Sequence, residues 1–234
     1  MISKALVPLY KKTSDGQAFV GSGFLISETL LATAWHVVRD EGRFLLFDGQ
    51  HIELNLVFKS YYDTRPNVHG PESDDLAIYQ LPVGTNSQYY LPLAPIAPAN
   101  GEACHALGFI PDDARISCIA PQRLDCSMWY EGINSPHNAQ NMIFLEGWSD
   151  SLHQGELYGM SGGPILNEAE EVVGLFFSGG LKKVPRLPGP EYKSTPNVEL
   201  FAISGAHIVE AMNKVLSSIS KIGIDQHLAE MVDS

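Results

Sequence analysis

A serine at position 161 lies in a segment dense with glycine, where backbone N–H groups can come close to a bound molecule. The segment reads Gly159-Met-Ser-Gly-Gly163, and glycine adopts backbone angles that bulkier residues avoid. A serine hydroxyl is a weak nucleophile at neutral pH and needs an adjacent base. The segment alone leaves two interpretations open: an ordinary glycine-rich turn, or a nucleophile whose base comes from elsewhere in the chain.

Two further segments supply a base and a carboxylate. His36 follows the apolar run 30–34, and Asp75 stands directly before another apolar run. Histidine titrates near neutral pH and can take the serine proton, while a buried carboxylate fixes its tautomer and stabilises the imidazolium. Asp74 is the rival carboxylate, but the apolar strand begins directly after Asp75. The sequence thus predicts that His36, Asp75 and Ser161 meet as a catalytic set.

The segments 21–38, 75–81 and 159–166 together resemble the chymotrypsin/trypsin-like serine peptidases, in their disulfide-poor bacterial form. The chain order of histidine, aspartate and serine is also that of the chymotrypsin type. The resemblance spans nearly the whole chain. It implies a serine endopeptidase that acts on protein or peptide substrates through an acyl-enzyme intermediate, without metal or organic cofactor. It further implies that the N–H groups of Gly159 and Ser161 form an oxyanion hole.

The resemblance also indicates a substrate pocket. The residue six positions before the nucleophile would lie at the bottom of the pocket for the residue before the cut, and here it is Gly155. Glycine offers no counter-charge for arginine or lysine, so the sequence favours an apolar or small uncharged residue there. The strand that contains Phe176, Phe177, Ser178 and Gly179 is expected to line one wall. The competing interpretation is that at least one of the two phenylalanines packs in the core.

The residue before the predicted nucleophile bears on activation. Digestive-type zymogens of the resembled family carry an aspartate there, which pairs with a freed N-terminus, whereas this chain has Met160. Control of activity is therefore expected to come from loop ordering, oligomerisation or a regulatory protein partner. The alternative function is a latent protease effector subunit, or a catalytically silent protease-fold binding module, in a larger bacterial complex. Three intact triad positions argue against the silent module.

The cysteines and remaining histidines give no sign of a metal site. The chain has neither Cys-x-x-Cys nor His-Glu-x-x-His, and Cys104, Cys118 and Cys126 are expected to be buried thiols on strands of the second barrel. An odd cysteine count and an N-terminus without an apolar signal segment favour a reducing, cytoplasmic compartment. The alternative is a secreted mature fragment from which the signal was removed.

The elements that must position these residues are short apolar runs separated by glycine, proline, asparagine and aspartate. Six precede the proline-rich joint 91–101 and six follow it, so the chain is predicted to be all-β, with two packed six-stranded antiparallel β-barrels of the chymotrypsin-like kind. The expected strands are 4–12, 18–27, 30–37, 43–47, 51–59 and 75–81, then 102–110, 115–130, 141–148, 164–166, 172–178 and 200–203.

One helix is predicted, at the C-terminus. Ser204 can cap it, apolar residues follow at helical spacing from Ile208, and Gly223 suggests its end. The expected domains are 1–92 for the barrel with the histidine and aspartate, 93–203 for the barrel with the serine, and 204–234 for the helix and tail. Together they form one peptidase domain.

Composition is compatible with this reading and excludes other classes. The chain has 234 residues, of which 44% are hydrophobic, with 21 glycines and 15 prolines. These values exclude collagen-like, coiled-coil and disordered classes. A formal net charge of −12 argues against nucleic acid or an anionic membrane as a partner. No apolar run is long enough to span a membrane.

Overall fold

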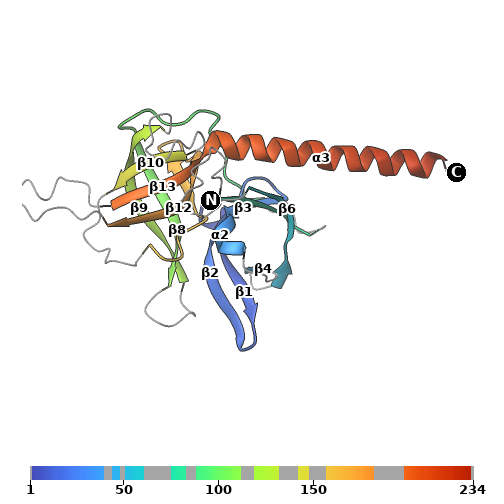
Figure 1. Cartoon of the computed structure of the whole chain (residues 1–234), viewed down its shortest axis with the longest axis horizontal. Coiled ribbons are helices and arrows are strands. Elements are labelled where there is room, and N and C mark those ends of the chain that lie inside the picture. The colour runs from blue at the N-terminus through green and yellow to red at the C-terminus, as the bar shows by residue number, and fades with distance from the viewer. Residues whose placement is uncertain are drawn as a thin grey trace, which may run out of the picture.

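The computed structural model describes residues 2–39, 44–47, 51–60, 75–82, 88–111, 119–131, 142–147, 157–181 and 198–232. Two β-structures lie side by side, and a long C-terminal helix starts between them and extends to one side (Figure 1). The first β-structure is formed by the N-terminal part of the chain and the second by the C-terminal part. This is the predicted all-β architecture with a terminal helix, except that the first half is a seven-stranded sheet and not the predicted six-stranded barrel.

The N-terminal half is a seven-stranded antiparallel sheet in the order β5-β4-β1-β2-β3-β7-β6. Its edge strands β5 and β6 are separated in the chain by Leu54 alone, so the sheet must curl enough to bring these two strands together at this corner. The predicted single strand 51–59 is therefore two strands, because the chain turns a corner at Leu54 from pairing with β4 to pairing with β7. The strands are β1 (Leu6–Thr13), β2 (Gly16–Leu25), β3 (Leu30–Ala34), β4 (Phe44–Phe47), β5 (His51–Glu53), β6 (Asn55–Lys59) and β7 (Leu76–Gln80).

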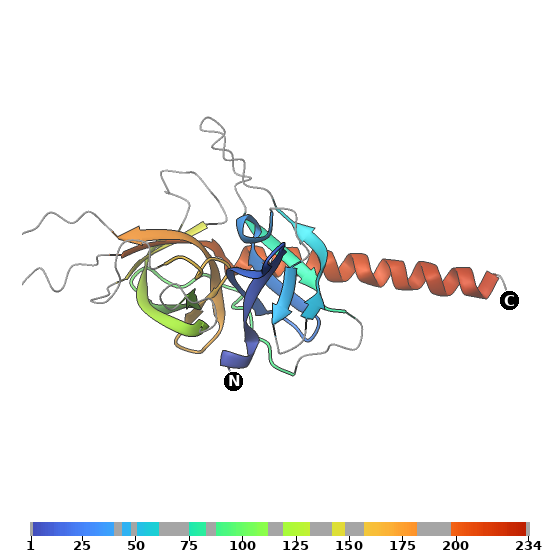
Figure 2. The ribbon, with the colours of Figure 1, turned by 90° about the horizontal axis from the view of Figure 1, so that it is seen from below.

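The C-terminal half is a closed six-stranded barrel in the order β10-β13-β12-β11-β8-β9, and Figure 2 shows it as a ring beside the sheet. Closure leaves no unpaired strand edge. The predicted strand count of this half is thus confirmed, although residues 112–118 lie outside the described residues. The strands are β8 (Ala103–Pro111), β9 (Ile119–Glu131), β10 (Met142–Gly147), β11 (Pro164–Asn167), β12 (Val172–Leu181) and β13 (Val198–Ser204).

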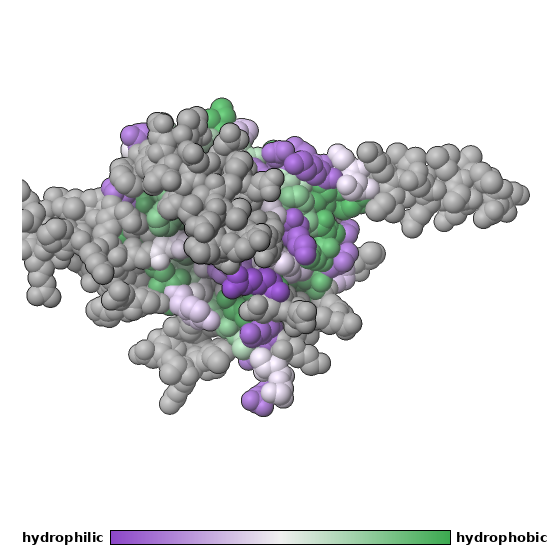
Figure 3. Space-filling view, viewed as in Figure 1, coloured by the Kyte–Doolittle hydropathy of each residue, from purple (hydrophilic) through white to green (hydrophobic). Residues whose placement is uncertain are grey.

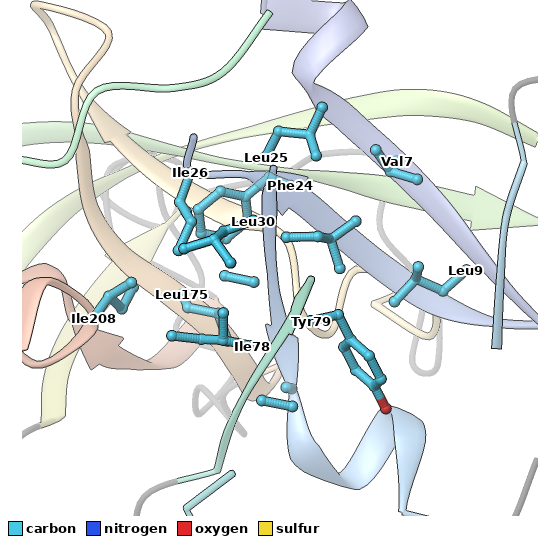
Figure 4. Close-up of a cluster of buried hydrophobic side chains, with 14 of the residues drawn as sticks. Val7, Leu9, Phe24, Leu25, Ile26, Leu30, Ile78, Tyr79, Leu175 and Ile208 are labelled. Atoms are coloured by element: carbon cyan, nitrogen blue, oxygen red, sulfur yellow. The ribbon is translucent and has the colours of Figure 1, made fainter. Parts of the chain in front are cut away.

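One apolar core joins the two halves. Phe24, Leu30 and Ile78 of the sheet belong to the same buried cluster as Leu175 of the barrel and Ile208 of the C-terminal helix (Figure 4). Each fully buried side chain of this size contributes about 1.5–3 kcal/mol relative to an exposed one. A second cluster fills the barrel itself. The shared cluster holds the sheet, the barrel and the start of the helix in fixed relative positions.

The helices within the described residues are α1 (Ile2–Ala5), α2 (Trp35–Val38) and α3 (Gly205–Val232). The predicted start of α3 is confirmed, because the hydroxyl of Ser204 accepts a hydrogen bond from the N–H of Ala206 at 3.2 Å. The predicted end at Gly223 is wrong, since glycine inside a helix costs only about 1 kcal/mol relative to alanine and does not by itself end it. None of the described helices is long and apolar enough to cross a membrane.

Candidate active site

His36 and Asp75 are brought together by the pairing of β3 with β7. The two strands are antiparallel, and Ala34 at the end of β3 lies opposite Leu76 at the start of β7. Because all five residues of β3 are buried, this register is fixed by core packing. The residue after β3 therefore emerges beside the residue that precedes β7.

The carboxylate of Asp75 holds His36 through two groups. One oxygen, Oδ1, accepts the backbone N–H of His36 at 2.7 Å, and the other, Oδ2, contacts Nδ1 of the imidazole. The backbone carbonyl of Asp75 also accepts the N–H of Trp35 at 2.9 Å. Residues 35–37, predicted as the end of a strand, are thus part of the short helix α2, because Asp75 satisfies N–H groups at its N-terminus. Asp74, the rival carboxylate, lies outside the described residues.

Asp75 is more deeply buried than His36, as expected for a fixed carboxylate beside an accessible imidazole. The side chain of Asp75 is 6% exposed, whereas that of His36 is 36% exposed. The contact of Nδ1 with the carboxylate leaves Nε2 for other partners. An imidazole held in this way is oriented and can accept a proton at Nε2.

Ser161 lies in a turn that only glycine allows. Gly159 and Gly162 have φ angles of +97° and +86°, in the left-handed region that favours glycine. A Cβ on Gly162 would lie 2.1 Å from the carbonyl oxygen of Ser22. The turn is tied down on both sides: Ser22 N–H donates to the carbonyl of Ser161 at 2.8 Å, and Gly162 N–H donates to that of Phe176 at 2.7 Å.

His36 and Ser161 line the same cavity, of about 220 Å³, at the junction of sheet and barrel. Its lining combines both halves of the chain: Lys11, Val20, His36, Val37, Tyr158, Gly159 and Ser161. The hydroxyl of Ser161 donates to the carbonyl of Phe177 at 3.4 Å, and no hydrogen bond joins it to His36, both residues being described. Catalytic hydrogen bonds are often long without substrate and tighten when it binds. The hydrogen bond between the hydroxyl and the imidazole remains a prediction.

The backbone around Ser161 offers donors to the cavity. Within the described part of the chain, neither the N–H of Gly159 nor that of Ser161 donates to a protein acceptor. Both residues line the cavity, so these N–H groups suit a negatively charged or polarised oxygen bound there.

The structure describes only some of the residues predicted for the substrate pocket. Gly155 lies outside the described residues. Phe176 is buried in the barrel core, whereas Phe177 is half-buried. The register of β12 against β13 shifts between Phe176 and Ser178, so Phe177 is an extra residue whose carbonyl is turned towards Ser161. Ser178 and Gly179 follow on the same strand, paired with Phe201 and Leu200.

Ser22 is a residue of this site that the sequence did not reveal. Its hydroxyl is buried, donates to the carbonyl of Gly159 at 2.7 Å and accepts the N–H of Phe109 at 2.8 Å. Its own carbonyl accepts the hydroxyl of Thr33 at 2.7 Å. The glycines on both sides of Ser22 indicate close packing, but no local pattern indicates a partner 137 residues away.

The described cysteines and His105 lie in the barrel, apart from this cavity. Cys104 and Cys126 are free thiols on opposite positions of β8 and β9, and burial raises the pKa of Cys104 to about 11 and that of Cys126 further. Both thiols thus stay protonated near neutral pH and are poor nucleophiles. Cys118 lies outside the described residues. Among the described residues, no three His, Cys, Asp or Glu side chains are grouped as metal ligands.

Comparison with known proteins points to one family. The model of the trypsin-like peptidase domain matches residues 21–175, which is more than half of the chain and contains His36, Asp75 and Ser161. No curated protein matches the chain. Together with the closed barrel, the curled sheet and the glycine turn at the cavity, this match shows that the chain belongs to the trypsin-like peptidase domain family.

Proposed function

We propose that the chain is a serine endopeptidase in which Ser161 is the nucleophile, His36 the general base and acid, and Asp75 the residue that orients the imidazole. One observation carries the proposal: the buried carboxylate of Asp75 holds both the backbone and the ring of His36, in a cavity that also contains Ser161. A structural histidine in the core would not be 36% exposed beside an accessible serine hydroxyl.

The proposed reaction has two halves. In the first, Oγ of Ser161 bonds to the carbonyl carbon of the substrate while its proton passes to Nε2 of His36, and that proton then moves to the leaving amine as the C–N bond breaks. In the second, water attacks the resulting ester, His36 takes the water proton, and Ser161 regains it as the acid leaves. Asp75 stabilises the imidazolium in both halves.

The N–H groups of Gly159 and Ser161 are proposed to bind the oxygen that becomes negatively charged. Removing one such donor in other enzymes costs about 10²–10³ in rate. The rim of β12, with Phe177, Ser178 and Gly179, is proposed to bind the acyl half of the substrate, since the carbonyl of Phe177 lies beside the nucleophile. The pocket role of Gly155, the domain boundaries, a cytoplasmic location and a regulatory protein partner stay predictions.

Labelling by a fluorophosphonate probe, together with cleavage of a diverse peptide library read by mass spectrometry, tests the proposal. The purified chain is expected to react at Ser161 and to cut peptides, and Ser161→Ala is expected to lose both while keeping its melting temperature. Ser217→Ala is a matched control, because it removes an exposed serine hydroxyl on α3, away from the cavity, and it should keep both activities. A chain that neither reacts nor cuts would instead favour the binding module, and cleavage that survives Ser161→Ala would refute the assignment.

A further inference from the structure

We propose that Lys11 makes this peptidase select substrates that carry an acidic side chain on the leaving-group side of the cut, within the first few residues. The proposal rests on the proposed function and adds a substrate class to it. Lys11 is on β1 and lines the cavity that contains His36 and Ser161.

A β-bulge lies next to Lys11 in the pairing of β1 with β2. The pairing of β1 with β2 shifts between Leu9 and Tyr10, which lie opposite Gly21 and Phe19, so that Val20 is an extra residue on β2. A bulge changes the direction of nearby side chains and is common beside active sites. Here Val20 and Lys11, from neighbouring strands, line one cavity.

The direction of the bound chain follows from the chemistry. The acyl carbon must bond to Ser161, while the leaving nitrogen must lie against His36, which gives it a proton. We take the lining residues from the same half of the chain as His36, namely Val37, Val20 and Lys11, as the wall on that side of the cavity. An extended chain advances about 3.3–3.6 Å per residue, so the residues just after the cut pass along this wall.

The charge of this wall is uncompensated. Within the described residues, Lys11 has no ion-pair partner, and the cavity lining contains no carboxylate. The nearest acid of the site, Asp75, is 6% exposed and is already engaged by His36. A lysine carries its charge on a flexible four-carbon stem and can reach a carboxylate at more than one substrate position.

The rest of the wall suits the stem of such a residue. Val20 and Val37 are apolar, and Tyr158, which also lines the cavity, is 67% exposed. These groups can pack on the methylenes of a glutamate whose carboxylate reaches Lys11. The formal net charge of the chain is −12, so a general attraction for acidic peptides is not expected. Any preference for acid must therefore be local.

The test uses one peptide that the chain cuts, resynthesised with Glu, Gln or Lys at each of the first three positions after the cut. The wild-type kcat/KM for Glu over Gln is expected to be about two- to five-fold at one of these positions, as for a partly exposed ion pair. In Lys11→Gln the ratio is expected to fall to about one, and in Lys11→Glu to reverse in favour of Lys. Lys214→Gln makes the same change in net charge on α3, away from the cavity, and should keep the wild-type ratio.

A salt series on the wild-type chain gives a second test that needs no variant. The Glu preference should shrink between 50 mM and 500 mM NaCl, because the Debye length falls from about 14 Å to about 4 Å over this range. A wild-type chain without Glu preference, or a preference that persists in Lys11→Gln, would overturn this inference and leave the proposed function standing. A wild-type chain that cuts no peptide would overturn both.

Discussion

The hydroxyl of Ser22 donates a 2.7 Å hydrogen bond to the carbonyl of Gly159, from a strand of the sheet to the turn of the barrel that carries Ser161. The N–H of the same serine binds the carbonyl of Ser161 at 2.8 Å. Ser22 thus holds the backbone on both sides of Met160. Ser22 therefore helps to fix the orientation of the peptide groups that are proposed to bind the oxyanion.

Replacement of Ser22 by alanine is therefore expected to lower kcat more than it changes KM. The carbonyl of Gly159 and the N–H of Phe109 would both lose their partner, and an unsatisfied buried group costs about 1–3 kcal/mol. A fall in kcat of about ten-fold or more follows if the turn loses its orientation. Peptide kinetics and urea unfolding measure the two effects.

Ser27→Ala is the matched control for that variant. The hydroxyl of Ser27 also accepts backbone N–H groups, from Thr29 and Leu30, but at the tip of the β2–β3 connection. It should lose stability and keep its kcat. Equal kcat values for the two variants would show that Ser22 has no positioning role.

Asp75→Asn is expected to lower kcat by about 10³–10⁴-fold without unfolding the chain, by analogy with the same change in related triads. The amide oxygen can still accept the N–H of His36. The amide nitrogen then faces Nδ1 and donates to it, which favours the wrong tautomer, with the imidazole proton on Nε2. Asp125→Asn, which removes an exposed carboxylate paired with Arg123, is the control. A kcat within ten-fold of wild type for Asp75→Asn would contradict the assigned role.

Gly162→Ala should be far more destabilising than Gly101→Ala. The two glycines have nearly the same φ, +86° and +85°, but a Cβ at Gly162 would lie 2.1 Å from the carbonyl oxygen of Ser22, whereas nothing lies within 4 Å of one at Gly101. The control should therefore lose only about 1–2 kcal/mol from backbone strain. Urea unfolding of both variants separates the cost of the backbone conformation from the cost of the steric clash. Similar losses in the free energy of unfolding would rule out the tight contact at Gly162.

Acid should destabilise the fold through His105. Burial lowers the pKa of this imidazole below its usual 6.5, and Arg123 lowers it further, against the opposing effect of Asp125 and Glu170. The folded state then binds fewer protons than the unfolded state, so stability is lost as pH falls through about 6.5. His105→Gln should flatten the decline in unfolding free energy between pH 7.5 and pH 5. Parallel curves for the two proteins would contradict this.

The sequence predicted most of the strands, because their apolar runs are short and clearly separated. It also predicted a partner for His36 at Asp75, since the apolar run begins directly after the carboxylate, and the structure brings the two side chains together. It did not predict the helix at 35–38, the break at Leu54 or the role of Ser22. Each of these depends on a hydrogen bond or a strand pairing with a distant segment, which local spacing does not encode.

The bonds from Ser22 to Gly159 and Ser161, together with the apolar cluster shared by Ile78 and Leu175, cross the boundary between the two halves. Apolar side chains also gather over the sheet below the start of α3 (Figure 3). A hinge motion that widened the catalytic cavity would have to break these buried links at once. Any control of activity is therefore expected to act without separating the two halves.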